Sequence, residues 1–280
     1  MSRETRYDTI GNWSVVKLDI VRRDASEYSK IMAKQTNPAF YHIYIDAFAG
    51  AGVHVSRATH EFVPGSPLNA LLIDPPFREY HFIDLEKKKI ESLERIARGR
   101  DDVHIYQEDC NKRLETIFHQ VRYEEYRRAL CLLDPYGLDL NWEVIQRAGS
   151  MKSIEIFLNF PVADMNRNVP WRDRSRVDQR QIDRMNAFWG DESWLEVAYK
   201  PDRQLSFLEA REEKAPNEEV AEGFRERLVK VAGFHYVPKP VPMRNSQNAI
   251  VYYLFFASQK AVAMKIVTDI FEKYSKWRAS

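Results

Sequence analysis

Five apolar stretches alternate with helical patterns between residues 43 and 160, and this alternation constrains the fold more than any other feature. The stretches cover residues 42–46, 79–84, 103–106, 129–134 and 154–160. The fourth is a continuous apolar run that ends in Asp134, which is typical of a strand buried on both faces. Strands separated by helices form a parallel sheet that carries helices on both faces. The sequence therefore predicts an α/β fold with right-handed crossovers.

The segments outside this alternation suggest how the rest of the chain is organised. Apolar residues at helical spacing predict one or two helices over residues 13–34, which end at Asn37-Pro38. We therefore predict an N-terminal helical segment over residues 1–40 and a second unit over 41–280. The polar, arginine-rich stretch at about 161–216 predicts a helical insertion in that unit. Two β-rich runs near the C-terminus complete a seven-stranded, mostly parallel sheet with an antiparallel C-terminal edge strand.

Composition sets limits on the compartment and on the partners. The formal net charge is only +1, so no overall basic field requires a nucleic-acid partner. The two cysteines, Cys110 and Cys131, are too few for a disulfide framework or a zinc cluster, and no metal site is predicted. The sequence shows no apolar run of signal-peptide type and none near the ~20 residues of a membrane span. We expect a cytoplasmic protein that does not bind membranes.

A loop rich in small residues follows the first strand of the alternation. Such residues let the backbone approach a ligand closely. A phosphate-binding loop would need Gly-Lys-Ser/Thr, and a nicotinamide fingerprint would run directly into a helix. Here helical sequence resumes only at Ser66-Pro67, where Ser66 is the expected N-cap. The candidate cofactor residues at this position are Asp46, Phe48, Ala49, Gly50, Gly52 and Ser66.

Acidic residues follow the second and third strands as well. A carboxylate at Asp84 can accept hydrogen bonds from both hydroxyls of a ribose, and Leu85 follows it. Asp109 can accept the exocyclic amine of adenine, while the backbone N–H of Cys110 reaches a ring nitrogen. The alternative for both aspartates is an ordinary helix N-cap. Ligands bind at the carboxyl ends of the strands in an open α/β sheet, so these groups are expected to converge.

The fourth strand ends in Asp134-Pro135-Tyr136-Gly137, the most informative motif in the chain. In amino-group methylation, an aspartate and a proline carbonyl accept the amine hydrogens while an aromatic ring stacks on a planar substrate. The carboxylate also stabilises the positive charge that develops on the nitrogen. The alternative is a β-turn, for which this tetrapeptide is well suited. With the other three strand ends, the motif predicts S-adenosylmethionine as cofactor, a Rossmann-like class I methyltransferase fold, and Asp134, Pro135 and Tyr136 as catalytic residues.

Several of these segments resemble the three-Cys-motif partner protein (TcmP) family, a bacterial group of predicted methyltransferases. They are WSVVKL from Trp13, YIDAFAGAG, GSPLNAL, FIDLE and DPYGLDLNW. The resemblance covers roughly residues 10–160 and continues more weakly to the C-terminus. It implies a partner protein with a three-cysteine motif that is radical-enzyme-like. Nothing in this chain's own residues indicates that partner.

The same tetrapeptide is similar to the D-P-F-G of tRNA N2,N2-dimethylguanosine methyltransferases and to the D/N-P-P-Y of adenine N6-methyltransferases, although it lacks the second proline. The likeness implies that Asp134 contacts a target amine and that Tyr136 stacks on the base. The missing proline leaves the identity of the base open. A likeness at this level fixes the cofactor better than the substrate.

The substrate side is predicted from more dispersed residues. Arginines of the insertion, Arg167 among them, either pair with interleaved aspartates on a solvated helix face or meet phosphates while Trp171 stacks on a base. Lys17, with other N-terminal cations, is expected to extend such a surface, and Asn159 is expected near the substrate mouth. Three hypotheses remain: a methyltransferase acting on a base of RNA or DNA, a non-catalytic Rossmann-like module supporting a partner protein, and a methyltransferase acting on a small molecule or a protein.

Overall fold

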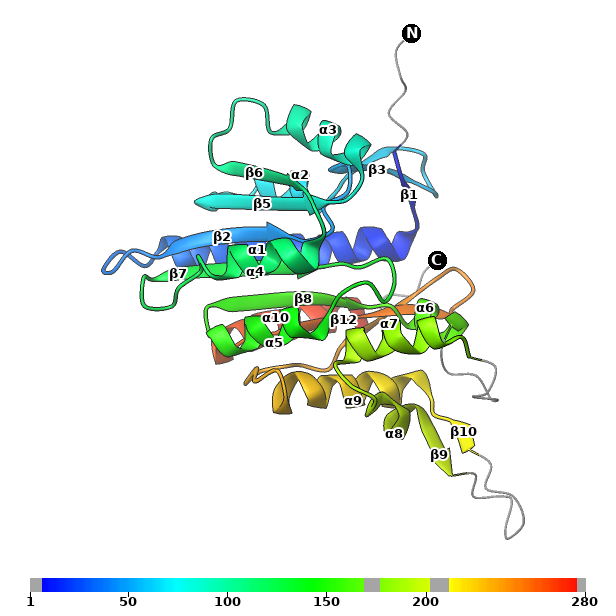
Figure 1. Cartoon of the computed structure of the whole chain (residues 1–280). Helices are drawn as coiled ribbons and strands as arrows, with labels where there is room; N and C mark the ends of the chain where they lie inside the picture. The colour runs from blue at the N-terminus through cyan, green and yellow to red at the C-terminus, as the bar shows by residue number, and fades with distance from the viewer. Residues whose placement is uncertain (1–6, 169–176, 202–211, 276–280) are drawn as a thin grey trace, which may run out of the picture.

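A seven-stranded sheet forms the centre of the protein (Figure 1). The computed structural model describes residues 7–168, 177–201 and 212–275, and the strand order within them is β11-β12-β8-β7-β2-β5-β6. The strands are β2 (Tyr41–Asp46), β5 (Glu79–Asp84), β6 (Val103–Gln107), β7 (Arg127–Leu133), β8 (Ile154–Phe160), β11 (Val241–Arg244) and β12 (Ile250–Ala257). Strands β6, β5, β2, β7 and β8 run parallel, whereas β12 is antiparallel to both β8 and β11.

The predicted fold class is therefore confirmed, with one refinement at the edge. The antiparallel strand β12 lies between β8 and β11, so β11 is the edge strand of the sheet. The central strands β2 and β7 are buried except for the first residue of each, and every residue of β8 is buried. This is the pattern that a parallel sheet covered by helices requires.

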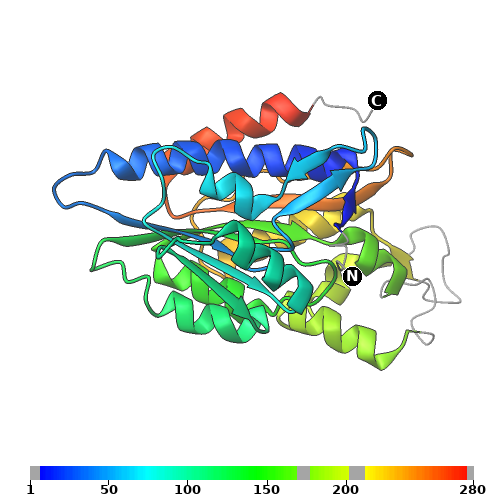
Figure 2. The same cartoon turned by 90° about the horizontal axis from the view of Figure 1, so that it is seen from above.

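Helices cover both faces of the sheet. They are α1 (Asn12–Ala33), α2 (Ser66–Leu71), α3 (Lys87–Ile96), α4 (Cys110–Phe118), α5 (Trp142–Met151), α9 (Asn217–Lys230) and α10 (Ala261–Ser275). One buried core includes residues of α4, α5 and α9, and a second includes residues of α1, α2, α3 and α10. Figure 2 shows α1 and α10 side by side on one side of the sheet, with α4 and α5 on the other. Among the described residues, no helix is both long enough and apolar enough to span a membrane.

The helix predicted for the N-terminal segment is confirmed. It begins after Gly11, which occupies the N-cap in extended conformation, and ends at Ala33, ahead of Asn37-Pro38. Its residues Ile20 and Val21 are buried in the core that α10 shares. The helix is therefore packed against the sheet unit along its length, and this packing positions Lys17 at one end of the sheet.

The insertion contains the predicted helices together with a pair of short strands. Its described elements are α6 (Val162–Asn168), α7 (Gln179–Trp189), α8 (Trp194–Ala198), β9 (Tyr199–Pro201) and β10 (Glu212–Lys214). The antiparallel pair β9–β10 was not predicted from the sequence. Phe188 of α7 is fully buried against Phe160 and Phe224, with ring centroids 5.6 Å from each. Helix α7 therefore belongs to the hydrophobic core, while Trp171 lies outside the described residues.

A small second sheet was also missed by the sequence analysis. It consists of β1 (Thr9–Ile10), β3 (Val53–Ser56) and β4 (Phe62–Pro64), in the order β1-β3-β4. Residues 53–56 were expected to belong to the loop between the first strand and the helical sequence at Ser66-Pro67. Strand β1, which precedes α1 in the sequence, pairs in parallel with β3, which follows β2. The periodicity of a sequence does not predict such a long-range pairing. This sheet builds one wall of the site described next.

Candidate functional site

The glycine-rich loop leaves β2 at the point where the strand order reverses. Its residue Ala47 donates a backbone hydrogen bond to Leu132 of β7 at 3.0 Å, and Ala49 donates one to Ile83 of β5 at 2.9 Å. The loop is thus fixed to both neighbours of β2, which lie on opposite sides of it. Ligands of open α/β sheets bind in the crevice at such a switch point.

Two glycines of this loop adopt backbone conformations that side chains rarely allow. Gly50 has φ +65° and Gly52 has φ +78°. A Cβ atom at Gly52 would lie 2.6 Å from Cδ1 of Ile96 on α3. The loop therefore needs glycine both for its backbone path and for its close approach to α3.

Asp84 holds this loop to the end of β5. Its Oδ2 accepts the backbone N–H of Gly50 at 3.0 Å, and its Oδ1 accepts that of Glu86 at 2.8 Å. Helix α3 has Glu86 at its N-cap, so the alternative role of Asp84 as the N-cap is wrong. The neighbouring Leu85 is 67% exposed.

Asp109 is the N-cap of α4, as the alternative interpretation predicted. Its side chain accepts the backbone N–H groups of Asn111 and Lys112 at 2.9 and 3.4 Å. Its role toward an adenine stays a prediction. Burial raises the pKa of the Cys110 thiol to about 12, so this cysteine is a protonated, apolar side chain at neutral pH.

Asp46 is fully buried at the end of β2. Its Oδ1 accepts the backbone N–H of Phe48 at 3.3 Å, whereas Oδ2 has no partner among the described residues. Burial raises the pKa of Asp46 to about 7, although the nearby Ser66 hydroxyl acts to lower it. Ser66 is the first residue of α2, and Gly65 occupies the N-cap, so the expected N-cap role of Ser66 is wrong. Gly65 is fixed there because its N–H donates to the carbonyl of Gly52 at 2.8 Å.

Asp134, directly after β7, forms an ion pair with Lys17 of α1. The Lys17 ammonium donates to Oδ2 of Asp134, and both side chains are largely buried. The same ammonium lies 5.3 Å from the ring centroid of Tyr252 on β12. The sequence analysis placed Lys17 on an extended basic surface, but the structure places it inside the site against the predicted catalytic aspartate.

The residues after Asp134 combine an exposed ring with a fixed carbonyl. Tyr136 is 69% exposed, and Lys89 of α3 places its ammonium 4.9 Å from the ring centroid and 3.4 Å from the hydroxyl. Asn159 of β8 is buried and donates from Nδ2 to the carbonyl of Pro135 at 3.4 Å. Asn159 therefore contacts the loop after β7, while its predicted place at the substrate mouth stays a prediction.

The insertion braces the end of the same loop. Oδ2 of Asp164 on α6 accepts the backbone N–H of Leu138 at 3.1 Å and an N–H of Arg184 on α7 at 3.2 Å. Arg184 also donates to Oδ1 of Asp139 at 3.1 Å. A Cβ at Gly137 would lie 2.6 Å from Oδ2 of Asp164, so the turn and the brace fit closely. The insertion thereby controls where the motif lies.

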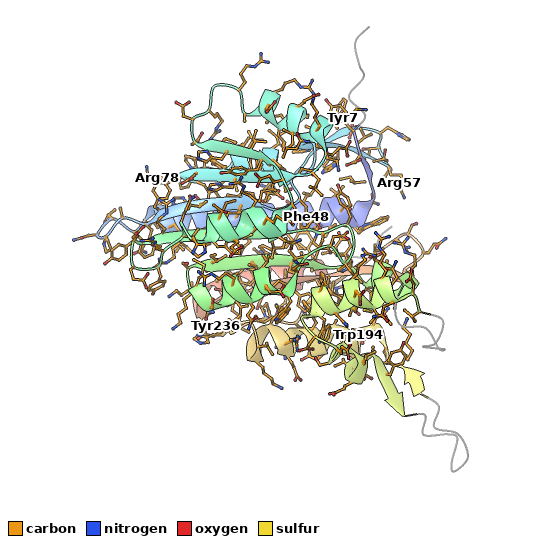
Figure 3. The ribbon with its side chains drawn as sticks, in the orientation of Figure 1. Tyr7, Phe48, Arg57, Arg78, Trp194 and Tyr236 are labelled. Carbon is orange, nitrogen blue, oxygen red and sulfur yellow. The ribbon has the colours of Figure 1, made fainter. Side chains whose placement is uncertain are left out.

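A cavity of about 340 Å³ joins these elements. It is lined by Asp8, Thr9, Ile10, Gly11, Trp13, Ser14, Lys17, Leu18, Phe48, Ala49, Gly50, His54, Arg57, Ser66, Asp134 and Tyr136. Of the predicted residues, Asp46, Gly52, Asp84, Leu85, Asp109, Cys110, Pro135, Asn159 and Arg167 are outside this lining. Figure 3 shows Phe48 near the middle of the molecule and Arg57 toward the side that carries β1.

The sequence analysis missed the wall that β1 and β3 build. His54 has a ring Nδ1 without a partner among the described residues, and burial lowers the pKa of its imidazole. Arg57 lies over the ring of Trp13 at 6.0 Å. The alternation of apolar and polar residues in Val53-His54-Val55-Ser56 was the sequence signal for β3. In a strand, this alternation places His54 on the face opposite to Val53 and Val55.

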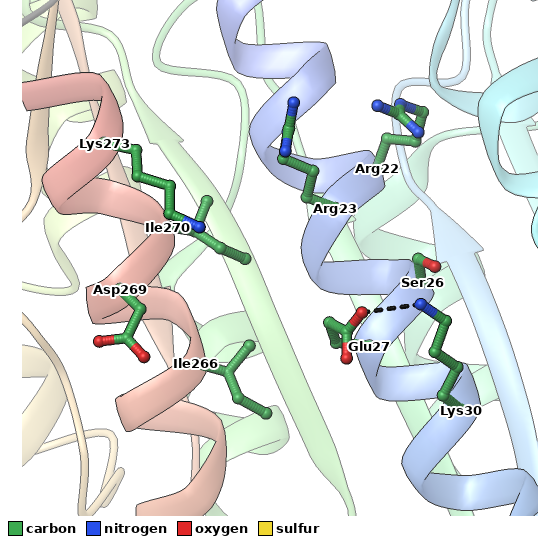
Figure 4. Close-up of a pocket in the computed structure, with 9 residues that line it drawn as sticks. All are labelled: Arg22, Arg23, Ser26, Glu27, Lys30, Ile266, Asp269, Ile270 and Lys273. Atoms are coloured by element: carbon green, nitrogen blue, oxygen red, sulfur yellow. Dashed lines mark hydrogen bonds and ion pairs between the residues drawn. The ribbon is translucent and has the colours of Figure 1, made fainter.

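The other predicted cations lie apart from this cavity. Arg167 is exposed, and its guanidinium is 3.9 Å from Oδ1 of Asp164. Arg22 and Arg23 pair with Asp19 on the surface of α1. Together with residues of α10 they line a separate, open cavity of about 460 Å³ (Figure 4). The N-terminal cations therefore do not form one surface with Lys17.

No protein-family model matches this sequence, and no curated protein matches it. Among solved structures, the chain is similar to protein LPL1258 from Legionella pneumophila, with 11% identity over 92% of both chains and a TM-score of 0.50. It also matches an S-adenosylmethionine-dependent methyltransferase from Leishmania major, with 11% identity, a TM-score of 0.39, and coverage of 87% of this chain and 72% of that one.

A second S-adenosylmethionine-dependent methyltransferase, from Agrobacterium tumefaciens, matches with 10% identity and a TM-score of 0.40. That match covers 89% of this chain and 62% of the other. Fold and chemistry are separable properties. At these identities the likeness to the Legionella protein shows a shared fold, and the activity has to be argued from the site.

Proposed function

We propose that this protein is an S-adenosylmethionine-dependent methyltransferase that methylates an exocyclic amine of a nucleic-acid base. One observation carries the proposal: a single cavity is lined both by the glycine loop, at Phe48, Ala49 and Gly50, and by Asp134 and Tyr136 of the fourth-strand motif. Part of the set predicted for the cofactor and two of the three residues predicted for the amine thus line one cavity. The structural neighbours from Leishmania major and Agrobacterium tumefaciens are S-adenosylmethionine-dependent methyltransferases.

The residues at the sheet edge are proposed to hold this cofactor. Gly50 and Gly52 give the loop a backbone path that admits close approach, and Leu85 offers an exposed apolar side chain. Asp84 uses each oxygen for one backbone N–H, and a carboxylate oxygen has a second lone pair for a ribose hydroxyl. Asp109 and the N–H of Cys110 are proposed to hold the adenine. When bound, S-adenosylmethionine supplies an electrophilic methyl group on a sulfonium.

The chain's own residues then hold the amine. In the proposal, the Asp134 carboxylate and the Pro135 carbonyl accept the amine hydrogens, and the exposed ring of Tyr136 stacks on the base. Such a carboxylate stabilises positive charge as it develops on nitrogen. Asn159 fixes the carbonyl of Pro135, and Asp164 fixes the backbone at Leu138, so the acceptors are held in place before the amine arrives.

A nucleic-acid base is the proposed substrate because of the ring and the charges beside it. Tyr136 is an exposed aromatic side chain with Lys89 directly over it, and Arg57 lines the same cavity. Stacking on such rings, with cations nearby for phosphates, is the usual way that proteins hold an unpaired base. The resemblance to the TcmP family supports the same activity and adds a three-cysteine, radical-enzyme-like protein as a proposed partner.

The ion pair at Asp134 favours a second candidate, a non-catalytic module that supports a partner protein. Lys17 already provides the carboxylate with an ammonium. A target amine must therefore either bind to the Asp134 carboxylate together with the Lys17 ammonium or displace that ammonium. A protein that kept this pair permanently closed would retain the cofactor cavity and have no turnover.

Two measurements test the proposal in sequence. Titration calorimetry with S-adenosylmethionine should show binding to the purified protein, and Asp134→Ala should retain it. Transfer of a tritiated methyl group from the cofactor to total RNA, DNA and cell extract, assayed in parallel, should label a nucleic acid with the wild type and not with Asp134→Ala. Binding without labelling of any fraction would support the scaffold candidate, and an absence of binding would reject the methyltransferase.

A further inference from the structure

A second built cavity lies at the opposite, amino end of strands β7 and β8. It has a volume of about 180 Å³ and is formed by residues of α1, the start of β7 and β8, and the segment after β12. Its lining consists of Tyr28, Ile31, Met32, Gln35, Phe40, Tyr123, Arg128, Lys152, Ser153, Ile154, Glu155, Gln259, Lys260 and Val262. It has no lining residue in common with the candidate methyltransferase site.

Arg128 is the central feature of this cavity. The residue is 6% exposed, and its side-chain hydrogen bonds among the described residues go to carbonyl oxygens and not to a carboxylate. Its Nη1 donates to the backbone carbonyls of Tyr123 and Arg127, at 3.0 and 2.8 Å. The rings of Tyr123 and Phe40 lie 3.9 and 4.9 Å from the guanidinium carbon. A guanidinium has five N–H donors, and a buried charge is normally paired, so this group is short of an anion.

The remaining charges favour an anion as well. Lys152 and Lys260 are exposed side chains on the rim of the cavity. The acidic group in the lining is Glu155, which is buried, and burial raises the pKa of its carboxyl to about 7. Three cations therefore face at most one negative charge. Behind the lining, Asp24 is also buried, and burial raises the pKa of its carboxyl, so it adds little negative charge at neutral pH.

An unsatisfied donor belongs to a residue in the same lining. Tyr28 lines the cavity and is buried, and its hydroxyl has no hydrogen-bond partner among the described residues. Leaving such a group without a partner costs about 1–3 kcal/mol, and a ligand oxygen would remove that cost. Apolar side chains of Ile31, Met32 and Ile154 complete the wall.

We propose that this cavity binds a small organic anion whose carboxylate or phosphate pairs with Arg128 and hydrogen-bonds to the Tyr28 hydroxyl. The apolar body of the ligand lies against Ile31, Met32 and Ile154. The rim lysines attract the anion and cover its exposed side. The site is independent of the proposed methyltransferase activity, since its residues lie at the other end of the sheet.

Calorimetry on the full chain tests this site with three probes. Benzoate should bind, and uncharged benzamide, which has the same ring, should not; inorganic phosphate tells whether the anionic group alone is sufficient. Arg128→Met should abolish benzoate binding, and Tyr28→Phe should weaken it about tenfold, as expected for one lost hydrogen bond to a charged group. Arg122→Met, which removes an exposed arginine outside the lining, is the matched control and should leave the affinity unchanged.

The outcomes separate the proposal from its rivals. Equal binding of benzoate and benzamide would show an apolar hole without anion recognition and would overturn the proposal. Unchanged affinity in Tyr28→Phe and Lys260→Met would overturn it too, and these two variants serve if Arg128→Met fails to fold. If neither benzoate nor phosphate binds the wild type, the proposal is wrong.

Discussion

Lys17 and Asp134 form an ion pair across 117 residues of sequence, and the pair joins the N-terminal helix to the end of the fourth strand of the alternation. Because the lysine is buried and the aspartate nearly so, each group depends on the other for its charge balance. Removing one partner of a buried pair leaves an uncompensated charge, which is strongly destabilising. The pair thus links the folding of α1 to the geometry of the proposed active site.

We therefore predict strong coupling between these two residues in unfolding experiments. Asp134→Ala and Lys17→Met should each lower the free energy of unfolding, whereas the double variant should be less destabilised than the sum of the two. The coupling free energy is expected to be about 0.5–3 kcal/mol, the range for residues in direct contact. Urea denaturation of the four proteins gives the value. Strict additivity would mean that the pair does not form in solution.

A second prediction concerns Asp46 and the pH dependence of stability. The pKa of Asp46 in the folded protein is about 7, above its ordinary value of 3.8, so the folded state binds the extra proton between these values. Stability should then fall as pH rises from about 4 to 7, by about 4 kcal/mol for this group, and level off above. Asp46→Asn should remove this share of the slope. If the variant and the wild type lose stability in parallel over that range, Asp46 is not the group responsible.

The insertion provides a third prediction. Arg184 and Asp164 brace the backbone after Tyr136, so Arg184→Met should displace the motif without touching the glycine loop. On the proposed function, the variant should lose methyl transfer by about tenfold or more, since misplaced acceptors raise the barrier, while its affinity for the cofactor stays within error. Arg180→Met, an exposed position on the same helix, serves as the control. Equal loss in both variants would point to a general effect on α7.

Much of this arrangement was accessible from sequence because it depends on local patterns. The apolar run that ends in Asp134 predicted a buried strand, and parallel strands bring their carboxyl ends to one edge, so Gly50 and Asp134 were expected near one another. They line one cavity, whereas Asp84 bonds to Gly50 from outside that lining. The pairing of Lys17 with Asp134 could not be predicted, because a helical pattern indicates on which face of the helix a lysine lies. It does not indicate which residue, distant in the sequence, the lysine contacts. The brace was hidden for a similar reason: Asp164 and Arg167 have the spacing of a helical surface pair, whereas Asp164 actually reaches Leu138 and Arg184.

The last prediction uses two glycines that differ in one respect. Gly52 and Gly99 have nearly the same φ, +78° and +80°, but a Cβ at Gly52 would lie 2.6 Å from Cδ1 of Ile96, while a Cβ at Gly99 would meet nothing within 4 Å. Gly99→Ala should therefore cost about 1 kcal/mol of unfolding free energy, from backbone strain alone. Gly52→Ala should cost more, because overpacking adds about 1–3 kcal/mol. It should also weaken binding of S-adenosylmethionine, because the displaced loop carries Gly50 and its bond to Asp84. Denaturation and calorimetry on both variants measure the two effects. An equal loss of unfolding free energy in the two variants would show that α3 moves to accommodate the added methyl group.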